Sequence, residues 1–469
     1  MAFRLTEDEV TTATSGRLVQ SAAPPQLTAV CTDTRHLQPN CLFVALEGDR
    51  FDAHQFIDQA ARLGAAAALV ERGKSFPAVP NHFGLIEVEN TLTALGALAN
   101  FHRRRFKIPI AAVTGSNGKT TTKEMIGSIL AQRGPALKTE GNLNNEIGVP
   151  LTLFGLEDFH RSAVIEMGMS HFGEIARLTA MTEPDAGLIT TVQEAHLEGV
   201  GSLEGVAKAK GELFLGLKAD AVAVVNADSP LIVEQSRHAS ARQIRYGIES
   251  SSEVWLSKVV LSGAGEGLEI VLSHSGQAWP IRLSFVGRHN AHNAAGAFAT
   301  GLALGFSPQS CVAGLEAARP YARRLSIRVG ENGVTVLDDC YNANPASMAA
   351  ALETVAELAT RGRAVAVLGD MLELGADASA AHQQIGDLAA AKADLVAFLG
   401  PLSEQGYRAA NRIGVRAAHF TEVAPLIEWL LPQLRPEDIV LVKASRGMRL
   451  ERVVDQLCEN KSSGVEAAH

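Results

Sequence analysis

The segment Val113-Thr114-Gly115-Ser116-Asn117-Gly118-Lys119-Thr120-Thr121 has the residues of a phosphate-binding loop. The apolar stretch IPIAAV before it predicts a buried strand, and the residues after it predict a helix over 119–132. Glycines let backbone N–H groups close around phosphate oxygens, and the start of a helix favours negative charge. In such a loop Lys119 reaches the β- and γ-phosphates and the Thr120 hydroxyl binds Mg²⁺. Val113 stands where the standard motif has its first glycine, so the strand–helix setting carries the prediction of nucleotide binding, and a glycine-rich turn without a ligand is the alternative.

Three downstream residues could build a metal site beside this loop. Glu166 ends the apolar strand SAVIEM, His196 follows the strand DAGLITT, and Lys210 lies on a predicted helix. Ligands gather at the carboxyl ends of strands in open α/β sheets, and a carboxylate with a threonine hydroxyl suits Mg²⁺. Taken singly, each residue also has a simpler explanation: a charge at a helix start, a packed histidine and an exposed helix lysine.

The elements that would hold these residues alternate between strand and helix. A length of 469 residues exceeds a single hydrophobic core and suggests about three domains. We predict a substrate-binding domain at 1–106, an ATP-binding domain at 107–318 and a Rossmann-like domain at 319–469. The fold class is therefore α/β, and the central domain has a doubly wound, mostly parallel sheet like that of P-loop ATPases.

Local patterns predict the elements and the first boundary. Apolar runs indicate strands at 41–46 and 65–70 with a helix at 52–63 between them. The Ser/Gly-rich segment 253–286 alternates polar and apolar residues and predicts an antiparallel insertion. The basic run 103–107 before Pro109 is interpreted as a solvated linker between domains. In the third domain we predict strands at TVLDDCYN, AVAVLGD, DLVAFLG and DIVLVKAS.

Composition excludes several classes of protein. The net charge of −9 is the opposite of the basic excess that nucleic-acid binders show, so we expect no nucleic-acid partner. The five cysteines lie far apart without metal-knuckle spacing and are expected to be reduced thiols. The N-terminus lacks a signal-peptide pattern, and no apolar stretch reaches the roughly 18 residues that span a bilayer. We expect a cytoplasmic protein that is not inserted in a membrane.

Several ordered motifs together resemble those of the Mur ligases. They are GSNGKTT, GNLNNEIGVPLTL from Gly141, EMGMSHFGEI from Glu166, AHLEGVGSLEGVAKAKGEL from Ala195, GRHNAHNAAGA from Gly287, DDCYNANPASM from Asp338 and LGDMLELG from Leu368. The resemblance spans residues 30–455, nearly the whole chain. Within the family, the stretches NLNNEIGVP and YNANP look like those of the ligases that add D-alanyl-D-alanine to a UDP-N-acetylmuramoyl-tripeptide.

The resemblance implies an ATP-dependent ligase of peptidoglycan precursor synthesis. ATP would phosphorylate the terminal carboxylate of UDP-N-acetylmuramoyl-tripeptide, and the amine of D-alanyl-D-alanine would attack the acyl phosphate. Lys119, Glu166, His196 and Lys210 are the catalytic positions that this implies. Thr120 and Glu166 look like ligands of one Mg²⁺, and His196 and Lys210 stand near a second Mg²⁺ with Glu166 shared. That lysine is commonly carbamylated in the family, which would make it an anionic oxygen ligand. We expect a monomer.

The same resemblance assigns the remaining site residues. For the nucleotide it implies Gly115, Ser116, Asn117, Gly118, Lys119, Thr120 and Thr121 at the triphosphate, Asn293 at adenine, Arg324 at the phosphates and Asp339 at the ribose. For the substrates it implies Thr32, Asp33, Arg35, Phe43, Gly48, Asp52, His54, Asn142, Asn144, Asn145, Tyr341, Asn342, Asn344, Lys443, Ser445 and Arg446. The Gly-Arg pair of the family is Arg323-Arg324 here, and its K-G-S-R motif has Ala444 in place of glycine.

Two other functions stay open at this point. A sister ligase would add a different amino acid, or glutamate to folate, and would differ in its acceptor pocket. A non-catalytic nucleotide-binding switch would need neither Glu166, His196 and Lys210 together nor the motifs of the third domain. The sequence also leaves open whether the tripeptide ends in diaminopimelate or lysine.

Overall fold

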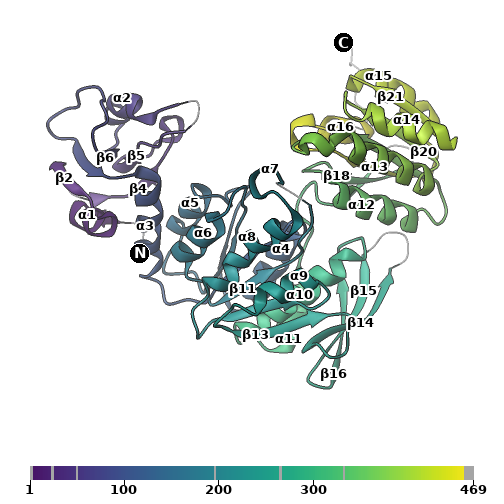
Figure 1. Cartoon of the computed structure of the whole chain (residues 1–469), viewed down its shortest axis with the longest axis horizontal. Coiled ribbons are helices and arrows are strands. Elements are labelled where there is room, and N and C mark those ends of the chain that lie inside the picture. The colour runs from purple at the N-terminus through teal and green to yellow at the C-terminus, as the bar shows by residue number, and fades with distance from the viewer. Residues whose placement is uncertain are drawn as a thin grey trace, which may run out of the picture.

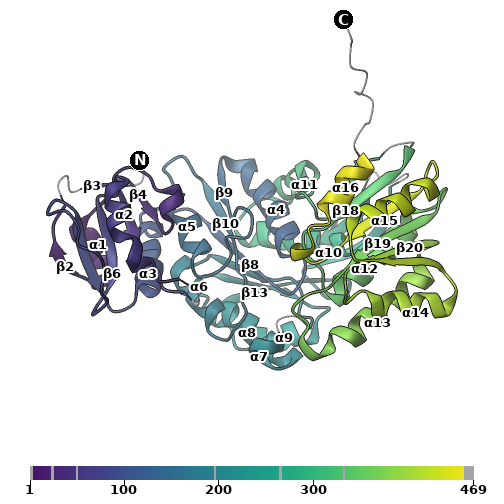
Figure 2. The ribbon, with the colours of Figure 1, turned by 90° about the horizontal axis from the view of Figure 1, so that it is seen from above.

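Three sheets follow one another along the chain in the computed structural model, which describes residues 4–22, 26–48, 51–194, 197–262, 267–330 and 333–458. Figure 1 shows the N-terminal sheet at the left, the largest sheet in the centre and the C-terminal sheet at the right. The view from above in Figure 2 shows the same order of the three regions. Helices cover the sheets, and most neighbouring strands are parallel. The predicted α/β class is therefore confirmed. None of the helices in the described ranges is both long and apolar enough to cross a membrane.

The N-terminal sheet has the strand order β2-β7-β6-β5-β4, and β1 pairs with β3 beside it. The strands predicted at 41–46 and 65–70 are present as β5 and β6, whereas the predicted helix at 52–63 is a 3₁₀ turn at Ala53–Phe56 followed by α2. The elements are β1 Leu5–Thr6, α1 Glu7–Thr14, β2 Arg17–Gln20, β3 Gln26–Leu27, β4 Ala29–Cys31, β5 Cys41–Val44, α2 Ile57–Arg62, β6 Ala67–Glu71, β7 Gly84–Val88 and α3 Thr91–Arg103.

The central sheet has the order β16-β15-β14-β13-β12-β11-β8-β10-β9. Strands β9 to β14 pair in parallel, and β14, β15 and β16 form the antiparallel extension expected at 253–286. The strands are β8 Ile110–Thr114, β9 Ala136–Lys138, β10 Ser162–Glu166, β11 Ala186–Ile189, β12 Val222–Asn226, β13 Arg242–Gly247, β14 Val254–Leu261, β15 Leu268–His274 and β16 Gln277–Leu283. The helices are α4 Lys119–Leu130, α5 Gly148–Phe154, α6 Glu174–Thr182, α7 Leu197–Val200, α8 Leu203–Leu215, α9 Pro230–Ser236, α10 His289–Ala303 and α11 Pro308–Ala317.

The C-terminal sheet has the order β17-β18-β22-β19-β20-β21, with β17 alone antiparallel to its neighbour among the described strands. All four strands predicted in this part are present, as β18, β19, β20 and β22. The strands are β17 Ser326–Val329, β18 Thr335–Asp339, β19 Ala364–Gly369, β20 Leu395–Leu399, β21 Arg416–Phe420 and β22 Ile439–Lys443. The helices are α12 Pro345–Leu358, α13 Ala378–Lys392, α14 Glu404–Ile413, α15 Val423–Leu430 and α16 Glu451–Cys458.

The basic run 103–107 was predicted to be a solvated linker; Arg104, Arg105 and Lys107 are exposed, but Arg103 is not. Arg103 is only 9% exposed, and its guanidinium donates hydrogen bonds to the carbonyl oxygens of Thr182 (2.8 Å) and Glu183 (3.1 Å). Arg104 forms an ion pair with the Glu183 side chain. The carbonyls at a helix end lack partners within the helix, so Arg103 satisfies those at the end of α6 and joins α3 to the central sheet region. The domain boundaries at 106 and 318 stay predictions.

Candidate active site

The strand order brings the phosphate loop and Glu166 to one edge of the central sheet. Strand β8 runs between β10 and β11, and Glu166 lies opposite Val113 in the register. Because these strands are parallel, the loop after β8 and the Glu166 carboxylate at the end of β10 lie side by side at the same edge of the sheet. A cleft of about 830 Å³ opens at this edge, with walls from both the central and the C-terminal regions.

The cleft contains most of the predicted nucleotide residues and part of the predicted substrate residues. From the central region it is lined by Ser116, Asn117, Gly118, Lys119, Thr120, Thr121, Asn142, Asn144, Asn145, Glu166 and Lys210. From the C-terminal region it is lined by Arg324, Tyr341, Asn342, Asn344, Ser445 and Arg446. Reasoning from sequence missed Glu146, Met169, Leu372, Glu373 and Leu374 in the same walls. The last three belong to the LGDMLELG motif, which could have indicated them.

Two glycines of the phosphate loop leave no room for a side chain. Gly115 has φ +150°, and a Cβ there would lie 1.9 Å from the Thr190 hydroxyl oxygen. Gly118 has φ +82°, and a Cβ there would lie 2.5 Å from the amide oxygen of Asn293. Gly118 is also the N-cap of α4, so the left-handed backbone turns the chain directly into the helix. This contact places Asn293, the residue expected at adenine, directly against the loop.

The Lys119 ammonium lies over its own loop. It donates hydrogen bonds to the carbonyl oxygens of Gly115 (2.6 Å) and Ser116 (3.3 Å). Burial lowers the pKa of Lys119, while Glu166 acts to raise it and Arg324 to lower it further. The ammonium thus stands where a phosphate group held by the loop would meet it.

The two carboxylate oxygens of Glu166 differ in their hydrogen bonds. Its Oε1 accepts a hydrogen bond from the Asn144 side chain (2.9 Å), and its backbone N–H donates to Thr139 Oγ1 (2.9 Å). Its Oε2 is buried and has no hydrogen-bond partner within the described ranges. A buried carboxylate oxygen without a partner is costly unless a cation occupies the space beside it, so this atom fits a bound divalent ion.

Lys210 projects from α8 into the same cleft, although it is only 1% exposed. Burial, and secondarily the charge of Lys119, lower the pKa of Lys210 far below its ordinary value. No carboxylate pairs with Lys210 in the part of the chain that the structure describes, so a charged amine here would be unstable. His196, the remaining predicted metal ligand, lies outside the described residues.

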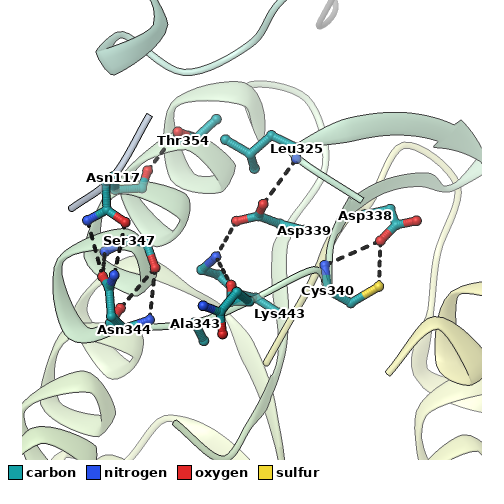
Figure 3. Close-up of polar contacts among 12 residues, drawn as sticks. Asn117, Leu325, Asp338, Asp339, Cys340, Ala343, Asn344, Ser347, Thr354 and Lys443 are labelled. Atoms are coloured by element: carbon teal, nitrogen blue, oxygen red, sulfur yellow. Dashed lines mark hydrogen bonds and ion pairs between the residues drawn. The ribbon is translucent and has the colours of Figure 1, made fainter. Parts of the chain in front are cut away.

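Asp339 and Lys443 form a buried pair where β18 and β22 end, and they lie opposite each other in the register. The Lys443 ammonium donates to Asp339 Oδ2 (2.6 Å), as Figure 3 shows. It also donates to the carbonyl oxygen of Asn342 (2.9 Å). Asp339 Oδ1 accepts from the backbone N–H of Leu325 (3.1 Å). Burial lowers the pKa of Lys443, and Asp339 partly offsets that effect. The pair fixes the start of the YNANP segment against the end of β22.

Two asparagine side chains join the phosphate loop to the C-terminal region. Asn344 Nδ2 donates to Asn117 Oδ1 (2.9 Å), and Asn117 Nδ2 donates to Asn344 Oδ1 (3.3 Å), as drawn in Figure 3. Asn344 is also the N-cap of α12, where its Oδ1 accepts from the Ser347 backbone N–H (2.8 Å). The sequence predicted both asparagines as site residues, but not their contact across the cleft.

The Tyr341 ring contacts two arginines in the wall of the cleft. The guanidinium carbon of Arg324 lies 4.1 Å from the ring centroid, and that of Arg446 lies 5.4 Å from it. Arg323, which replaces the glycine common in the family, has φ +64° and pairs with Glu451 (3.3 Å) outside the cleft. The left-handed backbone explains why glycine suits position 323, and it turns the neighbouring Arg324 toward the phosphate loop.

The Ala444 substitution in the motif Lys443-Ala444-Ser445-Arg446 is accommodated by a glycine on the neighbouring strand. A Cβ at Gly369 would lie 2.7 Å from the Cβ of Ala444. Ser445 keeps its contacts, because its hydroxyl oxygen accepts from the Leu372 backbone N–H (2.9 Å). The loop that carries Arg446 is therefore intact despite the missing glycine.

The predicted substrate residues of the N-terminal region form a separate group. Asp33 pairs with Arg35 (2.6 Å), whose hydrogen bonds lower the pKa of Asp33 to about 2. Asp52 Oδ1 accepts from the His54 backbone N–H (3.0 Å) and lies 2.6 Å from its ring Nδ1. The group comprises Thr32, Asp33, Arg35, Phe43, Gly48, Asp52 and His54; Phe43 and His54 are buried. None of these residues lines the cleft, where the N-terminal region, within the described ranges, contributes Leu92.

Comparisons with known proteins match most of the chain. The model of the Mur ligase family catalytic domain matches residues 26–103, that of the Mur ligase middle domain matches 113–301, and that of the Mur ligase glutamate ligase domain matches 323–446. The chain belongs to the Mur ligase family. The cleft of this Mur ligase is lined mainly by residues from the last two matched segments.

Two curated relatives of this Mur ligase carry the same name. UDP-N-acetylmuramoyl-tripeptide–D-alanyl-D-alanine ligase of Escherichia coli K12 is 41% identical over 438 residues, which cover 92% of this chain and 94% of the relative. The ligase of the same name from Bacillus subtilis 168 is 38% identical over 439 residues, with the same coverage.

Solved structures of similar chains have the same fold. A crystal structure of MurF from Acinetobacter baumannii superposes with a TM-score of 0.88 at 31% identity and covers 97% of this chain and 99% of that one. The MurF ligase of Thermotoga maritima in complex with ADP has a TM-score of 0.81 at 27% identity and covers 92% of this chain and 96% of that one. The three-domain Mur ligase fold is therefore the fold of this chain.

Proposed function

We propose that this Mur ligase joins D-alanyl-D-alanine to UDP-N-acetylmuramoyl-tripeptide with consumption of ATP, which gives the pentapeptide precursor of peptidoglycan. The relatives of that name, at 38–41% identity over nearly their whole length, support the reaction. The observation that carries the proposal is the cleft, in which a phosphate loop faces Arg324, Tyr341 and Arg446 of the C-terminal region. The ADP complex of a similar ligase supports a nucleotide at this loop.

The chemistry explains why a ligase needs ATP. A free carboxylate is a poor electrophile, because its charge repels nucleophiles and an oxide ion is a poor leaving group. A carboxylate oxygen of the tripeptide attacks the γ-phosphorus, the bond to ADP breaks, and an acyl phosphate forms. The neutral amine of the dipeptide then attacks the carbonyl carbon. The tetrahedral intermediate expels phosphate, the amine loses a proton, and an amide remains. The protein mainly positions the three reactants and stabilises negative charge.

Residues of the phosphate loop and of the opposite wall stabilise the negative charge of the transferred phosphate group. The loop 115–121 holds the triphosphate, with the Lys119 ammonium at the β- and γ-phosphates. Arg324 lies close enough to Lys119 to lower its pKa, so both cations serve the same phosphates. Asn293 contacts the loop from α10 and serves the adenine, and Asp339 serves the ribose.

Mg²⁺ is proposed at Thr120 and Glu166, with a second ion near His196 and Lys210. The orphaned Oε2 of Glu166 supports a cation there. A bound Mg²⁺ would offset phosphate charge and orient the transferred group. Carbamylation of Lys210 by CO₂ would form an N–C bond, release one proton and give the anionic oxygens that Mg²⁺ prefers. The lowered pKa of Lys210 favours the neutral amine that this step requires.

The remaining assignments extend the proposal to both substrates. The UDP-sugar is bound by the N-terminal residues Thr32, Asp33, Arg35, Phe43, Gly48, Asp52 and His54. The peptide part and the acceptor are bound by a second group, in which some residues contact the substrate and others position neighbouring side chains. This group comprises Asn142, Asn144, Asn145, Tyr341, Asn342, Asn344, Lys443, Ser445 and Arg446. The monomeric state and the cytoplasmic location stay predictions.

A substrate panel tests the function directly. Purified protein with ATP and Mg²⁺ is given the tripeptide, ending in diaminopimelate or in lysine, and one of D-alanyl-D-alanine, diaminopimelate, L-lysine or L-glutamate. Phosphate release that requires both the tripeptide and D-alanyl-D-alanine, with the pentapeptide as product, is expected. Turnover with another acceptor would instead indicate a sister ligase. Nucleotide binding without any phosphate release would indicate a switch.

A further inference from the structure

The Lys123 ammonium is a buried charge on the phosphate-loop helix that the proposed reaction does not use. Lys123 follows Lys119 by one helical turn of α4, and its side chain is fully buried. It does not line the cleft. Burying a cation is unfavourable unless protein groups replace the water that it loses. A lysine is therefore a poor residue for packing alone, and the groups that it contacts indicate its role.

Three groups surround this ammonium, which has three N–H bonds to donate. It donates a hydrogen bond to the carbonyl oxygen of Thr139 (2.7 Å) and forms an ion pair with Glu124 Oε1 (2.9 Å). It also lies 5.2 Å from the centroid of the Tyr321 ring, within the range of a cation–π contact. An apolar side chain of the same length could fill the space but could make none of these contacts.

Thr139 begins the segment that holds Glu166. The Glu166 backbone N–H donates to Thr139 Oγ1 (2.9 Å), and the Asn144 side chain donates to Glu166 Oε1 (2.9 Å). Segment 139–144 therefore supports this residue both at its backbone and at its carboxylate. Among the described residues, Oε2 is left without a hydrogen bond, as a cation site requires. Lys123 anchors the start of this supporting segment to α4.

Tyr321 brings the C-terminal region to the same ammonium. It lies between α11 and β17, in the segment that leads from the central region into the C-terminal sheet. Its ring meets the Tyr341 ring edge to face, with the two centroids 6.5 Å apart, and Tyr341 lines the cleft. A movement of the C-terminal region that displaces Tyr321 would therefore disturb the group that also anchors the support of Glu166.

We propose that Lys123 is a positioning residue that couples the place of the Glu166 carboxylate to the place of the C-terminal region. Its ammonium holds segment 139–144 and the Tyr321 ring at once. The inference rests on the proposed function, in which Glu166 binds a divalent ion. Residues that orient a metal ligand without touching the metal commonly change metal affinity by about 10–100-fold when they are replaced.

Paired substitutions separate the ammonium from its surroundings. Lys123→Met keeps the length of the side chain and removes its charge, and Lys123→Arg restores a charge. Tyr321→Leu removes the aromatic ring, whereas Tyr321→Phe keeps it. Lys138→Met is the matched control, because Lys138 forms an ion pair with the same Glu124 from a side chain that is 41% exposed.

Two measurements report the position of Glu166 without relying on turnover. Amide hydrogen exchange of the ligand-free protein follows the peptides that contain 139–144 and Glu166. Electron paramagnetic resonance measures the affinity for Mn²⁺, the probe ion, in the presence of ADP. Lys123→Met should speed the exchange by about tenfold or more, as expected when a hydrogen bond to a charged group is lost. It should weaken Mn²⁺ binding by about 10–100-fold, while the affinity for ADP without metal stays unchanged.

The other variants make the test specific. Lys123→Arg should recover part of both effects, and Tyr321→Leu should weaken Mn²⁺ binding by about 2–30-fold, the value of one cation–π contact. Tyr321→Phe and Lys138→Met should behave as the wild type. Unchanged exchange and Mn²⁺ affinity in Lys123→Met, or an equal change in Lys138→Met, would overturn the inference. An equal loss of ADP affinity would also overturn it, because it would indicate general damage to α4.

The test stays decisive if one variant or one assumption fails. If Lys123→Met does not fold, equal Mn²⁺ affinities of Tyr321→Leu and Tyr321→Phe would still overturn the coupling. Absence of Mn²⁺ binding or of ligation by the wild type would instead refute the proposed function. The exchange measurement needs no metal and decides the role of Lys123 in that case.

Discussion

The Asn117–Asn344 contact makes a quantitative prediction about how the C-terminal region docks on the phosphate loop. The two side chains exchange two hydrogen bonds of 2.9 Å and 3.3 Å across the cleft. A hydrogen bond between uncharged groups contributes about 0.5–1.5 kcal/mol net, so the pair contributes about 1–3 kcal/mol. That free energy corresponds to a factor of about 5–150 in the ratio of docked to undocked molecules. Both bonds are partly exposed, so the lower half of the range is expected.

The choice of variant decides whether the contact can be isolated. Asn344→Ala would also remove the N-cap of α12, which costs about 1 kcal/mol by itself. Asn344→Ser keeps an oxygen that can accept from the Ser347 backbone N–H, because serine caps helices about as well as asparagine, but it is too short to reach Asn117. Ser347→Ala is the matched control, since it weakens the cap and leaves the contact with Asn117 in place.

A double-mutant cycle with Asn117→Ala and Asn344→Ser separates the pair from other losses. Asn117→Ala also removes the hydrogen bond that Asn117 donates to Gln193. This loss occurs with and without Asn344→Ser, so it cancels in the coupling energy. Docking is measured as the distance distribution between spin labels at Arg237→Cys, at the C-cap of α9, and Arg412→Cys on α14, with Cys458 replaced by serine. A coupling of about 1–3 kcal/mol is expected. A coupling within about 0.5 kcal/mol of zero, or equal undocking in Ser347→Ala, would refute the reasoning.

Four further outcomes are expected. Lys119→Ala should lower the ligation rate by about 10²–10³ or more in a folded protein, because a charge contact to the transferred phosphate is lost, and near-normal turnover would contradict the phosphate-loop assignment. The Lys210→Ala variant should lose activity. It should regain part of that activity with formate or acetate, but not with chloride at equal ionic strength. Full activity of the variant without added carboxylate would refute the proposed carbamate. Small-angle scattering should show a smaller radius of gyration with ATP analogue and tripeptide, because the N-terminal substrate residues do not line the cleft, and an unchanged radius would count against closure. Lys443→Met should lower the free energy of unfolding by about 3–5 kcal/mol in urea melts, because the Asp339 carboxylate would stay buried without its partner. A decrease of less than about 1 kcal/mol would show that water reaches this carboxylate.

The sequence predicted several strands that are buried on both faces, but it missed β7 inside the N-terminal sheet and several strands at the sheet edges. Strands β8, β10 and β11 are continuous apolar runs, and their pattern is unambiguous. Strands β9, β17 and β21 end their sheets, are short, and keep most of their residues partly or fully exposed. An edge strand pairs on one side and is half solvated, so its sequence lacks a strong apolar signal. The interior strand β13, with the sequence RQIRYG, was missed because its residues are mostly polar.

The candidate site was predictable residue by residue but not as a set of contacts. The phosphate loop and Glu166 were found because their residue types follow strands at a known edge of the sheet, whereas Lys210 was found through the family motif that contains it. The Asn117–Asn344 contact joins residues 227 positions apart, and no local pattern specifies it. Arg103 was misinterpreted for a related reason. A basic run looks solvated until the carbonyls that its guanidinium satisfies are known, and these lie about 80 residues later.

The charges of the cleft explain why its parts depend on one another. Lys119, Lys210, Arg324 and Glu166 all line the cleft, and burial lowers the pKa of both lysines. Like charges gathered in a buried site destabilise it unless anions join them. Triphosphate at Lys119 and Arg324, and a carbamate at Lys210, would each remove part of that repulsion. A change in any one of these groups should therefore alter the affinity for the others, so the effects of single substitutions at Lys119 and Lys210 are not expected to add.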